Sequence, residues 1–164
     1  MPDVPDAMKE RGRPLDDYFL PAEQLFRRVP PELWDDAADD FDIESIELPD
    51  MSVLRAKYGH PEWARFDRGQ YTDWGVVGFA VRNLPPSIPH LGVFVWTFSP
   101  HHAPERNNYP HSEVRAFEDG RHIDMKLSDR IDPHLHLRWR HHLLRHIEKF
   151  ILPHQDVEFR EHSP

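Results

Sequence analysis

The chain has 164 residues, of which 38% are hydrophobic and 12% aromatic, and its formal net charge is −9. This length predicts one domain, and the absence of cysteine excludes disulfides, thiolate catalysis and thiolate metal sites and fits a reducing compartment. The first ten residues lack the apolar core of a secretory signal, and no run approaches the ~18 apolar residues of a membrane span, so we expect a cytoplasmic protein without membrane contact.

The charge is unevenly distributed along the chain. Residues 1–50 hold 15 acidic and 5 basic residues, whereas residues 51–164 hold 14 acidic and 15 basic residues and all 13 histidines. We therefore divide the chain into an acidic N-terminal arm (1–50) and an α+β domain (51–164). The acidic arm argues against nucleic-acid binding through net charge. It indicates a solvated segment, a docking surface for a basic partner, or a cover over the body of its own chain.

The arm is expected to be largely irregular. Residues 1–20 are rich in proline and charge, which predicts loose order. The apolar residues of 22–29 fall on one side of a helix, which predicts a short helix that stops at the following prolines. A helical turn is expected in 31–38, and the alternation of 41–48 predicts an extended edge segment.

Two segments of the body have the composition of buried strands. Residues 74–81 and 91–98 are short, rich in β-branched and aromatic residues, and bounded by glycine or proline. The connection between them contains three prolines and is expected to be irregular.

Residues 109–127 predict a β-hairpin around the Asp119-Gly120 turn. With a two-residue loop, the register pairs Glu113 with Lys126 and Arg115 with Asp124. One face of the hairpin is then apolar and the other is polar, as in a half-buried antiparallel sheet.

A long helix is expected at 132–152, because an acid followed by proline begins it and Pro153 ends it. Its apolar arc, which includes Trp139 and Leu143, would cover the sheet, and residues 156–161 would return as an edge strand. The fold class predicted is α+β, a four- to five-stranded mainly antiparallel meander covered by one long C-terminal helix, with the acidic irregular N-terminal arm.

The chain resembles a group of small, uncharacterised bacterial proteins that carry a "YPHSEVR"-type strand ahead of a hairpin and a final amphipathic segment. The resemblance covers residues 51–152. It rests on short motifs, namely Met51-Ser52-Val53, Lys57-Tyr58, Trp74-Gly75-Val76 and the run Asn108-Tyr109-Pro110-His111-Ser112-Glu113-Val114-Arg115. It implies an architecture and no mechanism.

Histidines and acids of the hairpin region suggest a metal site. Imidazole and carboxylate are ligands of Zn²⁺, Fe²⁺, Ni²⁺ and Mn²⁺. His111 and Glu113 are two apart on a strand and share a face, and the preceding loop would bring His101 or His102 over them. The alternative reading is a hydrated sheet face with cross-strand ion pairs worth ~0.2–1 kcal/mol each.

The spacing Asp124-Met125-Lys126 is also found in metal-dependent nucleases, with Glu113 as a second carboxylate and His111 nearby. Direct ion pairs within the predicted register explain the same charges without a metal. Nucleophilic catalysis finds little support, since Ser112 points away from its neighbour His111, and Ser99 and Ser128 lack a nucleophile elbow. No glycine loop for phosphate is present, so no nucleotide cofactor is expected.

The helix carries a basic, titratable face that suits a solvated surface or an acidic partner, including the chain's own arm. Its members are Arg138, His141, His142, Arg145 and Lys149. We therefore expect a non-catalytic accessory or protein-interaction module of a bacterial multi-protein system, with a protein partner and no cofactor. The alternative is a metal-dependent hydrolase or nuclease that uses a divalent metal ion at the 109–127 hairpin.

Overall fold

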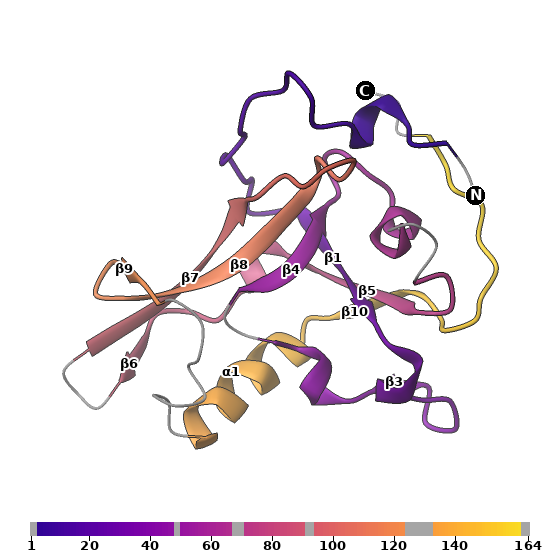
Figure 1. Ribbon diagram of the computed structural model, residues 1–164. Coiled ribbons are helices and arrows are strands. Elements are labelled where there is room, and N and C mark those ends of the chain that lie inside the picture. The colour runs from indigo at the N-terminus through magenta and orange to yellow at the C-terminus, as the bar shows by residue number, and fades with distance from the viewer. Residues whose placement is uncertain (1–2, 48–49, 67–70, 91–93, 124–132, 162–164) are drawn as a thin grey trace.

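The computed structural model describes residues 3–47, 50–66, 71–90, 94–123 and 133–161 (Figure 1). Ten strands lie in this part of the chain: β1 (Gln24–Val29), β2 (Trp34–Asp35), β3 (Asp40–Phe41), β4 (Met51–Arg55), β5 (Gly75–Ala80), β6 (Ile88–His90), β7 (Phe94–His102), β8 (His111–Glu118), β9 (Arg121–His122) and β10 (Glu148–Ile151). One α-helix, α1 (Pro133–Leu144), accompanies five 3-10 helices: Asp6–Met8, Pro31–Leu33, Ile43–Ser45, Pro61–Arg65 and Val81–Asn83.

The described residues form one large antiparallel sheet and one small hairpin, so the α+β class is confirmed. The large sheet has the strand order β10-β5-β1-β4-β8-β7-β6, and β9 pairs with β8 at one end. Strands β2 and β3 form a separate two-stranded sheet. The sheet is thus larger than the four or five strands expected, and its order is not that of a meander, because β1 lies between β5 and β4 in the interior and β10 pairs with β5 at the edge.

The two faces of the sheet bury different clusters. Helix α1 covers one face, where Trp139 and Leu143 are fully buried against Met51 and Val53. The 3-10 helix Pro61–Arg65 covers part of the other face, where Trp63 packs with the β1 residue Phe26 and with Leu54, Val76 and Ile151. Successive residues of a strand point to opposite faces of the sheet, so each strand contributes side chains to both clusters.

The predicted helix at 22–29 is wrong, because this segment is strand β1 in the interior of the sheet. It pairs with β5 from Gln24↔Ala80 to Val29↔Gly75, and with β4 at Leu25↔Arg55 and Phe26↔Leu54. An interior strand is buried on both faces, so its apolar residues need not alternate. The boundary at residue 50 therefore does not separate an irregular arm from the body, although the described residues before Gln24 contain no strand. Residues 41–48 hold the 3-10 helix Ile43–Ser45 after β3, not the expected extended segment.

The hairpin turn at Asp119-Gly120 is confirmed. Both turn residues have positive φ, 47° and 78°, and the pairs Phe117↔His122 and Glu118↔Arg121 have the predicted register. Beyond Ile123 the prediction fails. Asp124 and Lys126 lie outside the described residues, but on that side of β8 Ser52 of β4 is the partner of Glu113. Strand β4 pairs with the part of β8 that the second strand of the predicted hairpin was expected to pair with.

The C-terminal helix is shorter than expected and stops at Leu144, and residues 148–151 form the edge strand β10 instead of its last turns. Strand β10 pairs with β5 through Glu148↔Gly78 and Lys149↔Val77. The open edge of β5 carries unpaired backbone groups, and pairing them stabilises the strand over the helix. The predicted strand at 156–161 is wrong, because this segment has no regular structure.

Candidate functional site

The structure brings some of the predicted hairpin residues together on one sheet face. His111 and Glu113 share that face, and His101 lies across from Glu113 on β7. Glu113 accepts a hydrogen bond from Arg115 Nε at 2.9 Å. His102 points to the opposite face, so the pair His101-His102 is split. Burial lowers the pKa of His101, and the nearby charge of Arg115 lowers it further.

This face does not assemble a metal site from the described residues, where no three histidine, aspartate or glutamate side chains are grouped to hold an ion. The proposed nuclease residues Asp124 and Lys126 lie outside the described ranges. Within them, the carboxylate of Glu113 is engaged by a guanidinium rather than directed at a shared centre.

His111 instead meets a serine that sequence reasoning missed. Ser52 on β4 lies 2.7 Å from His111 Nε2 through its Oγ. His111 Nδ1 lies 2.6 Å from the carbonyl oxygen of Ala103. A carbonyl only accepts, so Nδ1 carries the proton and Nε2 of the neutral ring accepts from the Ser52 hydroxyl. The His111 side chain is 9% exposed and is thus held by packing as well as by these two bonds.

Ser52 lies at a split in the sheet. Strands β1 and β4 pair only at two positions and then diverge (Figure 1). The opening holds a cleft of about 240 Å³ lined by Arg27, Arg28, Ser52, Tyr71 and Trp74, among others. Arg27 bridges the split, donating to the carbonyls of Ser45 at 2.9 Å and Ser52 at 3.0 Å and to Glu47 at 3.0 Å.

Arg28 is also half-buried, but unlike Arg27 its guanidinium contacts aromatic rings. Its guanidinium stacks over the Tyr71 ring at 3.6 Å and lies 5.9 Å from the Trp74 ring. Among the described residues we find no hydrogen-bond or ion-pair partner for it. Arg28 and Ser52 also line a smaller adjoining pocket together with His111 and Asn108. The amide oxygen of Asn108 is buried without a hydrogen-bond partner.

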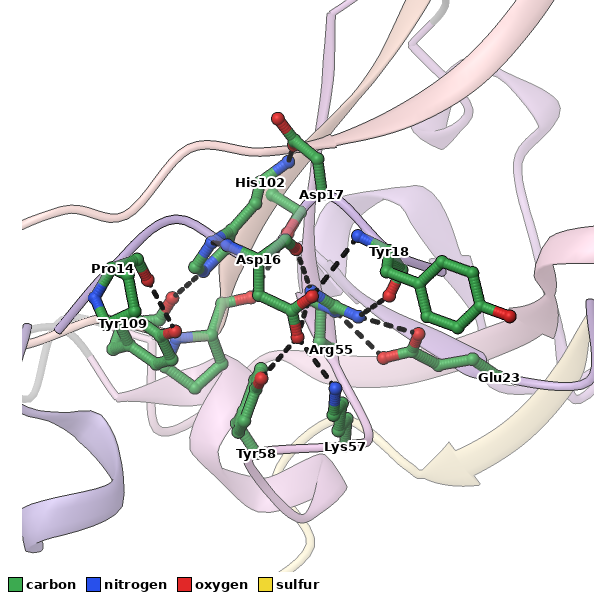
Figure 2. A network of polar contacts seen from close by, with 12 residues as sticks. Pro14, Asp16, Asp17, Tyr18, Glu23, Arg55, Lys57, Tyr58, His102 and Tyr109 are labelled. Atoms are coloured by element: carbon green, nitrogen blue, oxygen red, sulfur yellow. Dashed lines mark hydrogen bonds and ion pairs between the residues drawn. The ribbon is translucent and has the colours of Figure 1, made fainter. Parts of the chain in front are cut away.

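A second polar cluster fixes the N-terminal segment to the sheet (Figure 2). The fully buried Arg55 donates to both carboxylate oxygens of Glu23, each at 2.9 Å, and to the carbonyl of Tyr18 at 2.8 Å. It also donates to the carbonyl of Asp16. These contacts join residues before β1 to the end of β4.

Asp16 is the acceptor at the centre of this cluster. Its carboxylate accepts from Lys57 Nζ at 2.7 Å and from the Tyr58 hydroxyl. Burial raises the pKa of Asp16, but the hydrogen bonds from Lys57, Tyr58 and the Tyr18 N–H and the charge of Arg55 outweigh burial and hold that pKa far below its usual value. Asp16 therefore stays ionised, as an anchor rather than as a proton carrier.

His102 completes the cluster in its neutral form. Its Nε2 lies 2.7 Å from the Tyr109 carbonyl, and its Nδ1 accepts the Asp16 N–H at 2.9 Å. Burial lowers the pKa of His102 against the opposing hydrogen bond to Tyr109. The ring is thus a structural link between the N-terminal segment and β7, and not a metal ligand.

Helix α1 carries part of the basic face proposed from the sequence, because Arg138, His141 and His142 lie on it whereas Arg145 and Lys149 follow its end. The helix contains four histidines, two arginines and no acid. His134, Arg138 and His141 follow the i, i+4, i+7 spacing of one helical face, Arg145 lies in the turn after the helix, and all four are exposed. Leu137, beside them, is 43% exposed. Arg138 and Arg145 have no ion-pair partner among the described residues.

Two other residues of the predicted basic face are used within the molecule. Lys149 donates to the carbonyl of Asp39 and lies 3.8 Å from that residue's carboxylate. His142 is half-buried against His146, and burial, with the charges of His146 and Arg145, lowers its pKa. The acidic segment of 1–50 therefore contacts the body at Lys149, and it leaves Arg138 and Arg145 open.

No protein-family model, curated protein or solved structure matches the chain. Among the described helices, none combines the length and apolar character needed to cross a membrane.

Proposed function

We propose that this protein is an accessory, protein-interaction module that binds an acidic segment of a partner protein along the exposed face of α1. The single observation that supports this role most is the row of His134, Arg138 and His141 on a helix without an acid, continued by Arg145 in the turn that follows, in a chain of net charge −9. This binding role itself requires no catalysis.

The chemistry of the face selects the kind of partner. Carboxylates would pair with Arg138 and Arg145, and an apolar side chain would cover Leu137. A short acidic segment would interact mainly with the positive charges of this face. A nucleic acid, with its dense phosphate charge, would also be repelled by the acidic remainder of the molecule.

Binding of a synthetic helical peptide of glutamate and leucine, followed by fluorescence anisotropy, tests the proposal. The Arg138→Glu/Arg145→Glu variant is expected to weaken binding by about tenfold or more, equivalent to ~1.4 kcal/mol. Raising salt from about 0.05 to 0.5 M is expected to weaken wild-type binding, because salt screens exposed charges.

Charge reversal elsewhere provides the matched control. Arg82 and Arg121 are exposed on other elements, so Arg82→Glu/Arg121→Glu changes the net charge equally and should leave binding nearly unchanged. Equal losses in both double variants would reject the α1 site. Tighter binding of a DNA duplex, lost in the α1 variant alone, would replace the acidic protein segment by a nucleic acid.

A further inference from the structure

The contact between Ser52 and His111 has the geometry of a nucleophile and its base. The hydroxyl lies 2.7 Å from Nε2, and the opposite ring nitrogen is held 2.6 Å from the Ala103 carbonyl. The carbonyl oxygen therefore fixes the neutral tautomer that can remove the proton of Ser52. A base that is within hydrogen-bond reach of a nucleophile, and is itself oriented by a third group, is the arrangement used in covalent catalysis by serine.

We propose that Ser52 and His111 hydrolyse small anionic carboxylic esters bound in the cleft between β1 and β4. This activity is separate from partner binding by α1. Met51 and Val53 pack in the same cluster as Trp139 of α1, and Ser52, between them, points to the other face of the sheet.

Asn108 supplies the polar group that such a site needs beside its nucleophile. Its amide lines the same pocket as Ser52 and His111, and its buried oxygen has no partner. Rotation of the Asn108 side-chain amide by 180° presents its NH₂ group to the pocket. A buried polar group without a partner costs ~1–3 kcal/mol, and a substrate oxyanion would satisfy it.

Arg28 indicates the substrate class. Its guanidinium borders both the pocket of Ser52 and the larger cleft, and among the described residues it stacks on aromatic rings without an ion-pair partner, whereas Glu47, the acid that lines the cleft, pairs with Arg27. A carboxylate or phosphate on the substrate would pair with it, while Tyr71 and Trp74 would cover an apolar part. The cleft of about 240 Å³ admits a small ester rather than a polymer chain.

The reaction balances with water as the second substrate. Ser52 Oγ bonds to the ester carbonyl carbon as its proton passes to His111 Nε2, and the carbon–alkoxy bond then breaks. The protonated imidazole gives that proton to the leaving alkoxide, which departs as the alcohol. Water then repeats the sequence on the acyl-serine, releases the carboxylic acid and restores the Ser52 hydroxyl.

A second serine–histidine contact on the same face gives a control. Ser99 Oγ lies 3.0 Å from His101 Nε2. We find no hydrogen bond to the other nitrogen of His101 among the described residues, and its ring lies tilted against Phe117 with the centroids 5.2 Å apart, so no third group in this part of the chain fixes its tautomer. Ser99 is also not among the residues that line the cleft.

Labelling of the full chain with a fluorophosphonate tests the nucleophile, because this reagent bonds to activated serine hydroxyls and loses fluoride. Peptide mass spectrometry is expected to find the label on Ser52. Ser52→Ala should abolish labelling, His111→Gln should slow it ~100-fold or more, and Ser99→Ala should leave it unchanged. A label elsewhere, a wild-type rate in His111→Gln, or no label on folded wild-type protein would overturn the proposal. Ser52→Ala removes a single oxygen atom, so it still decides the matter if His111→Gln does not fold.

Hydrolysis of 4-nitrophenyl hemisuccinate and 4-nitrophenyl acetate tests the substrate class. Arg28→Gln is expected to raise KM about tenfold for the anionic succinyl ester, a loss of ~1.4 kcal/mol. KM for the neutral acetyl ester should hardly change. Equal effects on both esters would overturn the assignment of Arg28 to the substrate anion.

Discussion

Arg55 is a buried charged residue whose guanidinium hydrogen-bond partners all come from segments distant in the sequence. Its side chain is fully buried, and Glu23, which receives two of its hydrogen bonds, is 8% exposed. A buried guanidinium loses its hydration and requires an ion pair and full hydrogen bonding in return. The backbone carbonyls of Asp16 and Tyr18 provide the remaining acceptors.

Glu23→Ala is expected to lower the free energy of unfolding by ~3–5 kcal/mol, because it leaves Arg55 buried without its carboxylate. Denaturant unfolding measures the change. Glu47→Ala is the comparison, since Glu47 also pairs with an arginine but is 69% exposed, and it should cost about 1 kcal/mol or less. Similar losses for the two variants would mean that burial of the Arg55 pair contributes little.

His102 makes stability depend on pH in a defined direction. Its folded-state pKa is lowered by burial, so below about pH 6.5, the ordinary value for histidine, the unfolded chain binds more protons than the folded protein. The stability is therefore complete above about pH 6.5 and is lost as the pH falls toward the folded-state pKa. Asp16, with its much lower pKa, loses its contribution only in more acidic solution.

Unfolding followed by circular dichroism between about pH 7.5 and 5.5 measures this effect. Wild-type protein is expected to lose more stability across this range than His102→Gln. His101 and His142 also have lowered pKa values and titrate in both proteins, so the difference isolates His102. Parallel curves would show that His102 is not the source.

Individual residues were predictable from the sequence only where their partners are local. The Asp119-Gly120 turn depends on adjacent residues, and its register is confirmed. Ser52 and His111 are separated by 59 positions, and Arg55 and Glu23 by 32. Alternation could place Ser52 on the face of Leu54, but the meeting with His111 depends on the alignment of β4 with β8, which no local pattern specifies.

At the scale of elements, the short helix α1 covers the core of one sheet face through two fully buried side chains, Trp139 and Leu143. Trp139 and Leu143 are one turn apart and both fully buried, and Trp139 packs at 4.7 Å from the Phe98 ring and 5.1 Å from the Trp96 ring. His141, on the outer side, is exposed. The helix thus has one buried position per turn and an open face.

Trp139→Ala is expected to destabilise the protein by ~3–5 kcal/mol and Leu143→Ala by ~2–5 kcal/mol, since each leaves a cavity in the core. His141→Ala should change stability by ~0.5 kcal/mol or less. Thermal and urea unfolding of the three variants measure these effects. A large loss at His141 would contradict the orientation of α1.

The element boundaries missed by the sequence share one physical cause. Residues 24–29 and 148–151 have apolar spacings that suit a helix in isolation, but both become strands on either side of β5. Pairing with an existing sheet supplies hydrogen bonds and two-sided burial that outweigh local helix propensity. Strand β5 itself, buried throughout and bounded by a turn, was predicted because its composition alone specifies a strand.

At the scale of the whole molecule, the acidic and basic parts of the chain are folded together. Arg27 contacts Glu47, and Lys149 contacts Asp39, so acids of the first fifty residues neutralise cations of both the sheet and the C-terminal part. The cationic face of α1 stands out because these internal pairs do not reach it. The overall class was predictable from composition, whereas the strand order was not, since it depends on pairings between distant segments.

The strand order β10-β5-β1 also governs when folding can finish. The first and last strands of the large sheet flank β5, and the tail beyond β10 is held where Glu62 accepts from Arg160 Nε at 2.8 Å and Trp63 donates to the Arg160 carbonyl. A nascent chain on the ribosome can form β1 and β5 early, but this edge of β5 remains open until residues 148–151 have emerged. Such non-local closure slows folding and leaves a template for association exposed during synthesis. Pairing of this edge therefore has to wait for a strand that lies far along the chain from β5, whatever the local propensity of β5 itself.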